Sequence, residues 1–491
     1  MKTSTSTRSY TSKPPRSFAP LSLLSTVLLL ATSITSTVDA KCSHDIAERG
    51  LEFHNKMKAM RNDLQKRQSP ASPTDLAQQM AITDPTLECA HYYNAEVNAL
   101  VASYPPVWQI ASIVQGDDEA TQAYNAIVND PNFPNLPPKG TPQGDFTGVN
   151  YTDADPDCWW SWSRCDTPKH ANLPADTTTC PEPDTWGLSL DDGPNCTHNA
   201  LYDYLQENDY TASLFFIGSN VIDWPFQAQR GLHDGHDIGV HTWSHRYSTA
   251  LTNEQFFAEL WYTRKIIKEI VGVTPTTWRA PFGDVDDRIR FIAHAMGLTT
   301  VLWDHDTFDW QIENAGNPNG LPTASVLQNY DSIYSAAAQG QFSTHGAIVL
   351  THEINGATMD LVMSELPTIA KNFKHVVPVT TCQNISHPYV EQSFTFPTFA
   401  QWLNGNTKMS NSSSISNSTT STSSASMTTS SSASMGSSTM TRQSTSSRIP
   451  SAINAANAAV TAKKTDTSGA VKRSAGTVTA LTVLAVAFLI C

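Results

Sequence analysis

The chain has 491 residues, of which 40% are hydrophobic and 15% are charged, and its formal net charge is −14 at pH 7. An acidic protein repels the phosphate backbone, so this balance argues against nucleic acid as a partner. No repeat of fixed period is visible in the sequence, which argues against a solenoid or a propeller.

The N-terminus has the layout of a secretory signal peptide. Basic residues are followed by an apolar run over residues 21–30 and then by the short stretch Val38-Asp39-Ala40. We therefore expect residues 1–40 to be removed, with cleavage just before Lys41, and the protein to be secreted. An N-terminal membrane anchor is the weaker alternative, because the apolar run is too short to cross a bilayer comfortably.

The region after the signal peptide, residues 41–180, is predicted to be rich in loops, and its role is left open. One helix is plausible over residues 45–66, and proline-rich segments follow it. Three tryptophans, Trp159, Trp160 and Trp162, lie between two cysteines. Their faces would suit stacking on sugar rings, but ordinary packing against the next domain is the favoured interpretation.

Residues 181–400 have a different sequence pattern, in which short apolar runs alternate with segments of helical periodicity. The clearest helix begins at a capping box, in which Thr252 is followed by Gln255, and another is predicted over residues 197–207. Strands that alternate with helices imply a parallel sheet, either a barrel or an open doubly wound sheet. The predicted strands span residues 186–190, 212–217, 237–240, 276–278, 299–303 and 347–350.

Ionisable residues follow the carboxyl ends of five of these predicted strands. In a barrel all such ends meet on one face, which is where catalytic residues gather. This placement is hard to obtain by chance in a chain of which only 15% is charged. The residues concerned are Asp191, Asp192, His241, His245, Arg279, Asp306, Asp309 and His352.

Two histidines and one carboxylate form a candidate metal site. His241 and His245 are four residues apart, so on a helical turn both rings would lie on one side and could reach one ion. Asp191 or Asp192 could complete a three-ligand site with open positions for water. A metal on Asp192 would also relieve the repulsion between the two carboxylates and leave Asp191 free to accept a proton. The alternative is a helix N-terminus capped by Asp, with Gly193-Pro194 as a simple turn.

The region over residues 185–380 resembles the polysaccharide deacetylase (NodB-homology) family, and the secreted architecture is similar to that of fungal chitin deacetylases. The resemblance implies an α/β fold, an irregular (β/α) barrel. Ser189-Leu190 differs mildly from the Thr-Phe that is more usual there, and we expect little effect because the change touches no ionisable group. The five motifs that carry the resemblance are Ser189-Leu190-Asp191-Asp192-Gly193-Pro194, His241-Thr242-Trp243-Ser244-His245, Arg279-Ala280-Pro281-Phe282-Gly283, Asp306-Thr307-Phe308-Asp309-Trp310 and Ile348-Val349-Leu350-Thr351-His352.

The resemblance implies metal-dependent hydrolysis of the N-acetyl groups of chitin, which gives chitosan and acetate, with zinc or cobalt as the ion. The implied metal ligands are Asp192, His241 and His245. The implied catalytic residues are Asp191 as the general base, Arg279 as the residue that orients it, His352 as the general acid and Asp309 as the residue that tunes it. The implied substrate contacts are the backbone N–H of Phe282, at the oxyanion, and the side chains of Trp310 and Leu350, around the acetyl methyl group.

Other functions are weighed against this one. His352-Glu353 lacks the second histidine of a zinc-protease helix, and the chain has no Gly-x-Ser-x-Gly elbow of a serine hydrolase. A deacetylase or esterase of another acetylated polysaccharide, such as xylan or peptidoglycan, stays open. So does a catalytically silent wall mannoprotein that binds glycan, although none of its ligand or acid–base positions is substituted.

The C-terminal part consists of a low-complexity segment and an anchor signal. Residues 401–468 are dominated by Ser and Thr, with too little apolar surface to offset the entropy cost of ordering, so we predict a disordered, O-glycosylated stalk. Small residues at 468–470, a polar spacer and an apolar tail then form the pattern of a GPI-anchor signal, with residues 469–491 as its propeptide. The expected location is the cell membrane and cell wall, beside glucan or chitin. The tail is too short for a permanent transmembrane segment to be the better interpretation.

The cysteines point to an oxidising compartment. No CxxC pair occurs, so disulfides are expected rather than a cysteine zinc ribbon. Cys491 would leave with the tail, and the odd number that remains means that one thiol stays free or pairs with another chain. The connectivity is not predicted. The remaining cysteines are Cys42, Cys89, Cys158, Cys165, Cys180, Cys196 and Cys382.

Overall fold

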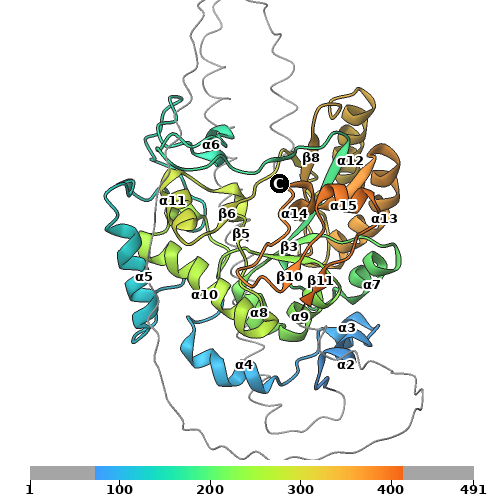
Figure 1. The fold of residues 1–491 in the computed structure, drawn as a ribbon, viewed down its shortest axis with the longest axis horizontal. Helices are drawn as coiled ribbons and strands as arrows, with labels where there is room; N and C mark the ends of the chain where they lie inside the picture. Colours follow the sequence, from blue (N-terminus) through green and yellow to red (C-terminus); the bar gives the residue numbers. More distant parts are fainter. Residues whose placement is uncertain (1–71, 413–491) are drawn as a thin grey trace, which may run out of the picture.

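The structure is a computed structural model that describes residues 72–412 (Figure 1). The predicted signal peptide, the helix over residues 45–66, most of the stalk and the anchor signal lie outside the described residues, so they stay predictions. Within residues 72–412, no helix has both the length and the apolar character that crossing a membrane would require.

One large sheet forms the centre of the molecule. Its middle strand, β2, is buried along its whole length, as a parallel strand covered on both faces must be. All the pairings in this sheet are parallel except that of β1 with β8. The strands are β1 (Thr179–Cys180), β2 (Thr185–Gly193), β3 (Ser213–Phe216), β4 (Asp237–Val240), β5 (Thr277–Trp278), β6 (Thr299–Thr300), β7 (His305–Asp306), β8 (Gly346–Leu350) and β9 (His375–Pro378).

The sheet closes into an irregular barrel. From β2 the pairing runs through β3, β4 and β5 to β6, and on its other side β2 pairs with β8. The chain over residues 299–306 pairs with β5 at its beginning, through β6, and with β8 at its end, through β7. One segment therefore joins both edges of the sheet, and the predicted irregular (β/α) barrel is confirmed. The strand predicted over residues 299–303 is shorter than expected because the chain crosses between two partners there.

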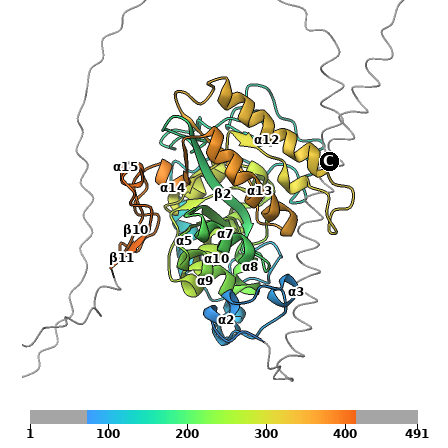
Figure 2. The same cartoon turned by 90° about the vertical axis from the view of Figure 1, so that its right-hand side faces the viewer.

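Helices surround the barrel (Figures 1 and 2). The longest begins at the predicted capping box, where Thr252 and Gln255 bond reciprocally, and it ends at Gly272, whose φ of 91° is in the left-handed region. The covering helices are α7 (Asn199–Glu207), α8 (Gly218–Asp223), α9 (Pro225–His233), α10 (Asn253–Val271), α11 (Asp287–Ala295), α12 (Thr323–Ala338) and α13 (Gly356–Asn372).

Short elements flank the barrel at both ends of the described chain. Before it lie α2 (Leu76–Met80), α3 (Pro85–Glu88), α4 (Ala95–Leu100), α5 (Asp118–Val128) and α6 (Trp160–Ser163). After it lie α14 (Val379–Cys382), β10 (Phe394–Thr395), α15 (Phe399–Leu403) and β11 (Ser410–Asn411).

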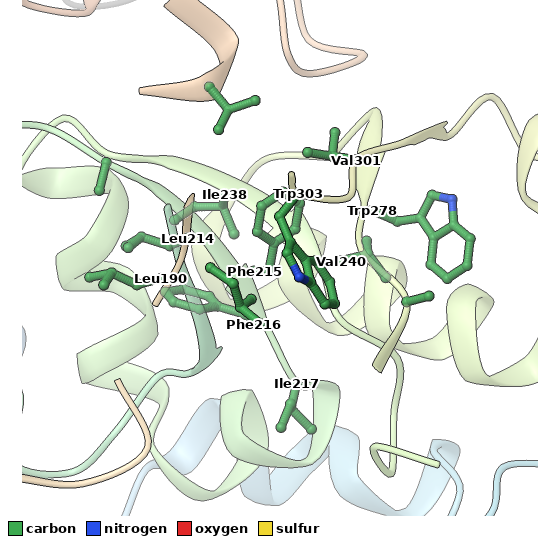
Figure 3. Packing of buried hydrophobic residues seen from close by; sticks show 14 of the residues in the cluster. Leu190, Leu214, Phe215, Phe216, Ile217, Ile238, Val240, Trp278, Val301 and Trp303 are labelled. Atoms are coloured by element: carbon green, nitrogen blue, oxygen red, sulfur yellow. The ribbon is translucent and has the colours of Figure 1, made fainter. Parts of the chain in front are cut away.

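The core is made by apolar side chains from successive strands. Figure 3 shows Leu190 of β2, Leu214 of β3 and Ile238 of β4 close together, with Trp278 of β5 farther along the sheet. All four are buried, and removing such a side chain from water contributes about 1.5–3 kcal/mol to folding.

The N-terminal region packs into this same core. Tyr104, Trp108 and Trp160 belong to one hydrophobic cluster with the barrel strands. The backbone N–H of Trp108 also donates to Ser219 Oγ at 2.8 Å, across the boundary that the sequence predicts at residues 180/181. That boundary does not coincide with a gap in the packing.

Three disulfides supply the connectivity that the sequence left open. They join Cys89 to Cys196, Cys158 to Cys165 and Cys180 to Cys382. Cys42, the remaining cysteine, lies outside the described residues. The Cys89–Cys196 bond ties the N-terminal region to the loop that follows β2, and the Cys180–Cys382 bond ties β1 to α14.

Candidate active site

Asp192, His241 and His245 converge at the carboxyl ends of β2 and β4. Asp192 Oδ1 lies 3.2 Å from His241 Nε2 and 3.0 Å from His245 Nε2, and all three side chains are buried. The other ring nitrogen of His241 lies 2.9 Å from the backbone oxygen of Arg279, which can only accept. In a neutral ring that nitrogen carries the hydrogen, so Nε2 directs a lone pair at Asp192.

This donor set fits a divalent metal ion. Asp192 Oδ1 accepts no hydrogen bond from any residue in the described range, although it is buried. Burial lowers the pKa of His245, which favours the neutral ring that coordinates metals. Two imidazole nitrogens and a carboxylate oxygen whose lone pairs meet at one point repel one another unless a cation lies between them. The structure therefore brings together the three residues that were predicted as ligands.

The reason given for the histidine spacing is wrong, however. His241 and His245 do not lie on a helical turn but in a loop after β4, and both Thr242 and His245 have positive φ values, 63° and 54°. The two rings face the same point because the loop doubles back. The His245 N–H donates to Thr242 Oγ1 at 3.2 Å within that turn.

Glu259 of α10 holds this loop in place. Its buried carboxylate accepts the backbone N–H groups of Trp243 and Ser244, at 2.8 and 2.7 Å, and the Ser244 hydroxyl at 2.7 Å. Its other hydrogen bond comes from the backbone N–H of Ala111, at 2.8 Å. One carboxylate therefore connects the histidine loop to the N-terminal region, a role that no pattern along the chain predicts.

Asp191 is fixed by Arg279. Asp191 Oδ1 lies 2.6 Å from Arg279 Nη1, and the buried guanidinium also donates to Ser189 Oγ at 2.9 Å and to two backbone carbonyl groups. The expectation that Ser189-Leu190 touches no ionisable group is therefore wrong. The helix-cap alternative is also wrong, because the two aspartates lie within β2 and α7 begins only at Asn199.

His352 is held by Asp309, the first residue of the short 3₁₀ helix η4 (Asp309–Gln311). The His352 Nδ1 lies 2.6 Å from Asp309 Oδ1, and the His352 backbone N–H donates to Asp309 Oδ2 at 2.8 Å. Burial alone would lower the pKa of His352, but the Asp309 carboxylate outweighs burial and raises that pKa to about 10. The ring is therefore protonated near neutral pH.

Asp191 and His352 are placed opposite each other by the backbone. They form an isolated parallel bridge, in which the Asp191 N–H donates to Thr351 O and the Glu353 N–H donates to Asp191 O, both at 3.0 Å. A carboxylate and an imidazolium thus lie at neighbouring positions of adjacent chain segments, beside the Asp-His-His cluster.

These groups open into one cavity of about 480 Å³. Eight of the ten predicted site residues line it, namely Asp191, Asp192, His241, His245, Phe282, Leu350, His352 and Trp310. Arg279 and Asp309 lie behind them, buried against Asp191 and His352. Phe282 belongs to η3 (Pro281–Gly283), and its ring packs on His245 at a centroid distance of 4.7 Å.

One wall of the cavity was not predicted. Phe146, Trp159, Trp160 and Trp162 line it, from the region whose role the sequence left open. The cluster of tryptophans was the available signal. The packing interpretation is confirmed for two of them, and stacking on sugar rings stays a prediction. Trp159 and Trp160 are buried in packing contacts, whereas Trp162 is exposed.

A barrel whose strand ends carry a candidate metal site, a fixed carboxylate and a protonated imidazole is typical of a hydrolase. Residues 178–301 match the polysaccharide deacetylase family model. Chitin deacetylase 2 of Cryptococcus neoformans var. grubii is 49% identical over 344 residues, which cover 70% of this chain and 75% of that protein. The chitin deacetylase of Amylomyces rouxii is 44% identical over 348 residues, which cover 69% of this chain and 79% of that protein.

This chain therefore belongs to the polysaccharide deacetylase family, as the sequence motifs predict, and it is a hydrolase of the deacetylase class. A solved structure of the chitin deacetylase from Colletotrichum lindemuthianum is also similar, with 23% identity and a TM-score of 0.39, over 43% of this chain and 92% of that chain.

We expect Asp192→Asn to weaken metal binding, because it removes one of three ligands. Loss of a residue that only hydrogen-bonds to a ligand typically costs roughly 10- to 100-fold in affinity, and this loss should be larger. Titration calorimetry of the metal-free protein with Zn²⁺ would measure this. Asp306→Asn is the matched control, since Asp306 lines the same cavity but is not part of the cluster. Equal affinities of Asp192→Asn and the native protein would show that the ion binds elsewhere.

Proposed function

We propose that this protein hydrolyses the N-acetyl groups of N-acetylglucosamine residues in chitin, giving chitosan and acetate, with zinc or cobalt held by Asp192, His241 and His245. The observation that carries the proposal is the arrangement of Asp191 and His352, a proton acceptor and a proton donor beside one cluster of metal-ligating atoms. The two relatives described above, both named chitin deacetylases, support chitin as the substrate.

The reaction needs a water molecule to lose a proton as it attacks the acetamide carbon. An ion bound at the three ligands supplies Lewis-acid chemistry, which polarises a carbonyl group and makes water more acidic. Asp191 accepts the proton, and the ion pair with Arg279 at 2.6 Å holds its carboxylate in position. The other oxygen of Asp191 lies 3.9 Å from His241 Nε2, so it faces the ligand cluster.

Breaking the C–N bond needs a proton on the leaving amine. His352 donates it from Nε2, because Asp309 binds Nδ1 and holds the ring in the protonated form. The backbone N–H of Phe282 stabilises the oxyanion, a kind of contact whose loss typically costs about 3 kcal/mol. Trp310 and Leu350, which line the same cavity, surround the acetyl methyl group.

The direct test is acetate release from chitin oligomers. We expect Asp191→Asn to lower kcat by roughly 10²- to 10⁴-fold, the usual contribution of a general base, while Zn²⁺ still binds. Asp306→Asn should keep most of the activity. A chelator should abolish acetate release, and zinc or cobalt should restore it. Native activity in Asp191→Asn would contradict the assigned base, and glycan binding without acetate release by the native protein would favour a silent wall protein.

The His352–Asp309 pair predicts how activity depends on pH. The acid works only while His352 is protonated, so kcat/KM falls as pH rises through the pKa of His352. Asp309→Asn removes the charge that raises this pKa, so the basic limb of the kcat/KM profile should move to lower pH. The loss of activity should therefore be larger at pH 9 than at pH 6. An unchanged basic limb would mean that another group is the acid.

We also propose that the protein is secreted, attached to the cell membrane by a GPI anchor and in contact with wall chitin or glucan. The terminal patterns of the sequence support this. Phosphatidylinositol-specific phospholipase C should release the protein from intact cells, and a stop codon before residue 469 should send it to the medium. Retention inside the cell in either experiment would contradict the proposal.

A further inference from the structure

A wall of the cavity is built by residues 144–164, which precede the segment that matches the family model. This wall and the side chains of Asp191 and His352 line one cavity. A cavity of about 480 Å³ is much larger than an acetamide group needs, and it is in the range that encloses ligands of several rings. The wall therefore has room for sugar beyond the reacting group.

The wall is rigidly attached to the barrel. The Trp159 indole N–H donates to Asp284 Oδ1 at 2.7 Å, and the backbone N–H of Trp160 donates to the backbone oxygen of Val285 at 2.9 Å. A Cβ on Gly283 would lie 2.1 Å from the Trp160 ring, so the two segments pack as closely as a glycine permits. Because Gly283 follows Phe282, the wall is positioned by the same turn that carries a predicted substrate contact. A ligand that binds there meets a preformed surface.

Trp162 is the exposed member of this wall. It is 49% exposed, whereas Trp159 and Trp160 are each 3% exposed. Its ring stacks on Trp159 at a centroid distance of 5.9 Å and an interplanar angle of 13°, and Tyr151 meets it edge-on at 5.5 Å. These contacts fix the ring but leave half of its surface to solvent. An aromatic side chain that lines a cavity and keeps half of its surface exposed is available to a ligand.

We propose that Trp162 forms a carbohydrate subsite that stacks on a sugar ring next to the one that loses its acetyl group. The C–H groups on the face of a pyranose ring match the negative face of an indole, and aromatic stacking of this kind has no need of a charge. The occupant is a neighbouring N-acetylglucosamine of the same polymer chain, so this inference rests on the proposed function. It follows that longer oligomers bind better than short ones.

The test compares chitohexaose with the monosaccharide N-acetylglucosamine as substrates. Trp162→Ala should raise KM for the hexamer by roughly two- to tenfold, the size of one aromatic stacking contact, and should change kcat little. For the monosaccharide, which has no neighbouring ring to reach this subsite, the change in KM should be smaller. Trp162→Phe should recover most of the hexamer affinity, because it restores an aromatic face.

Tyr93→Ala is the matched control. Tyr93 is 48% exposed, lies between α3 and α4, and does not line the cavity. Equal hexamer KM values for Trp162→Ala and Tyr93→Ala would overturn the subsite. Acetate release by both variants would still leave the proposed function intact. An equal rise in KM for the monosaccharide and the hexamer would also overturn it, since Trp162 would then act on the reacting sugar itself.

A binding measurement separates the subsite from catalysis. Calorimetric titration of Asp191→Asn with chitohexaose, with and without Trp162→Ala, should show the same weakening of roughly two- to tenfold. If the native protein released no acetate from any oligomer, the proposed function would fail, and this titration would still decide the subsite. Thermal unfolding of each variant checks the fold, and weaker binding by Trp162→Ala with an unchanged melting temperature supports a direct contact.

Discussion

The site depends on one short backbone pairing, between the end of β2 and the chain that follows β8. Through the two hydrogen bonds at Asp191, this pairing sets the carboxylate beside His352 although the two residues are far apart in sequence. Hydrogen bonds in a buried ladder leave little freedom to the side chains they carry, because every unpaired N–H or C=O would cost free energy. Asp191 and His352 take their relative positions from it.

The charges around this pairing are balanced group by group. Arg279 neutralises Asp191, and His352 neutralises Asp309. Glu353, which follows His352, is also buried, and burial with the nearby aspartates raises its pKa well above the usual range. Glu353 therefore stays uncharged, with Tyr202 O–H as its hydrogen-bond donor at 3.1 Å, and adds no further negative charge. Asp192 has no such partner among residues 72–412 apart from the imidazoles of His241 and His245, which is why a cation suits that position.

The sequence predicted the barrel well because its signals are local. The strand over residues 237–240 and the capping box at Thr252 depend on a few neighbouring residues, and the structure has both. The five motifs likewise marked which residues meet at the strand ends. What failed depends on three-dimensional contacts. The loop geometry of His241 and His245 comes from positive φ angles and from Glu259 on a distant helix, and the hydroxyl of Ser189 meets Arg279 only after folding. No spacing along the chain encodes such contacts.

The N-terminal region acquires a role from its contacts with the histidine loop. Tyr104 stacks on Trp243 at 5.8 Å, the Trp243 indole N–H donates to Pro106 O, and Ala111 bonds to the Glu259 carboxylate that holds the loop. The N-terminal region is therefore part of the scaffold of the histidine loop, although it precedes residues 178–301, which match the family model. A fragment cut at residue 181 would retain all ten predicted site residues, yet it would lose these contacts, which hold the loop that carries His241 and His245.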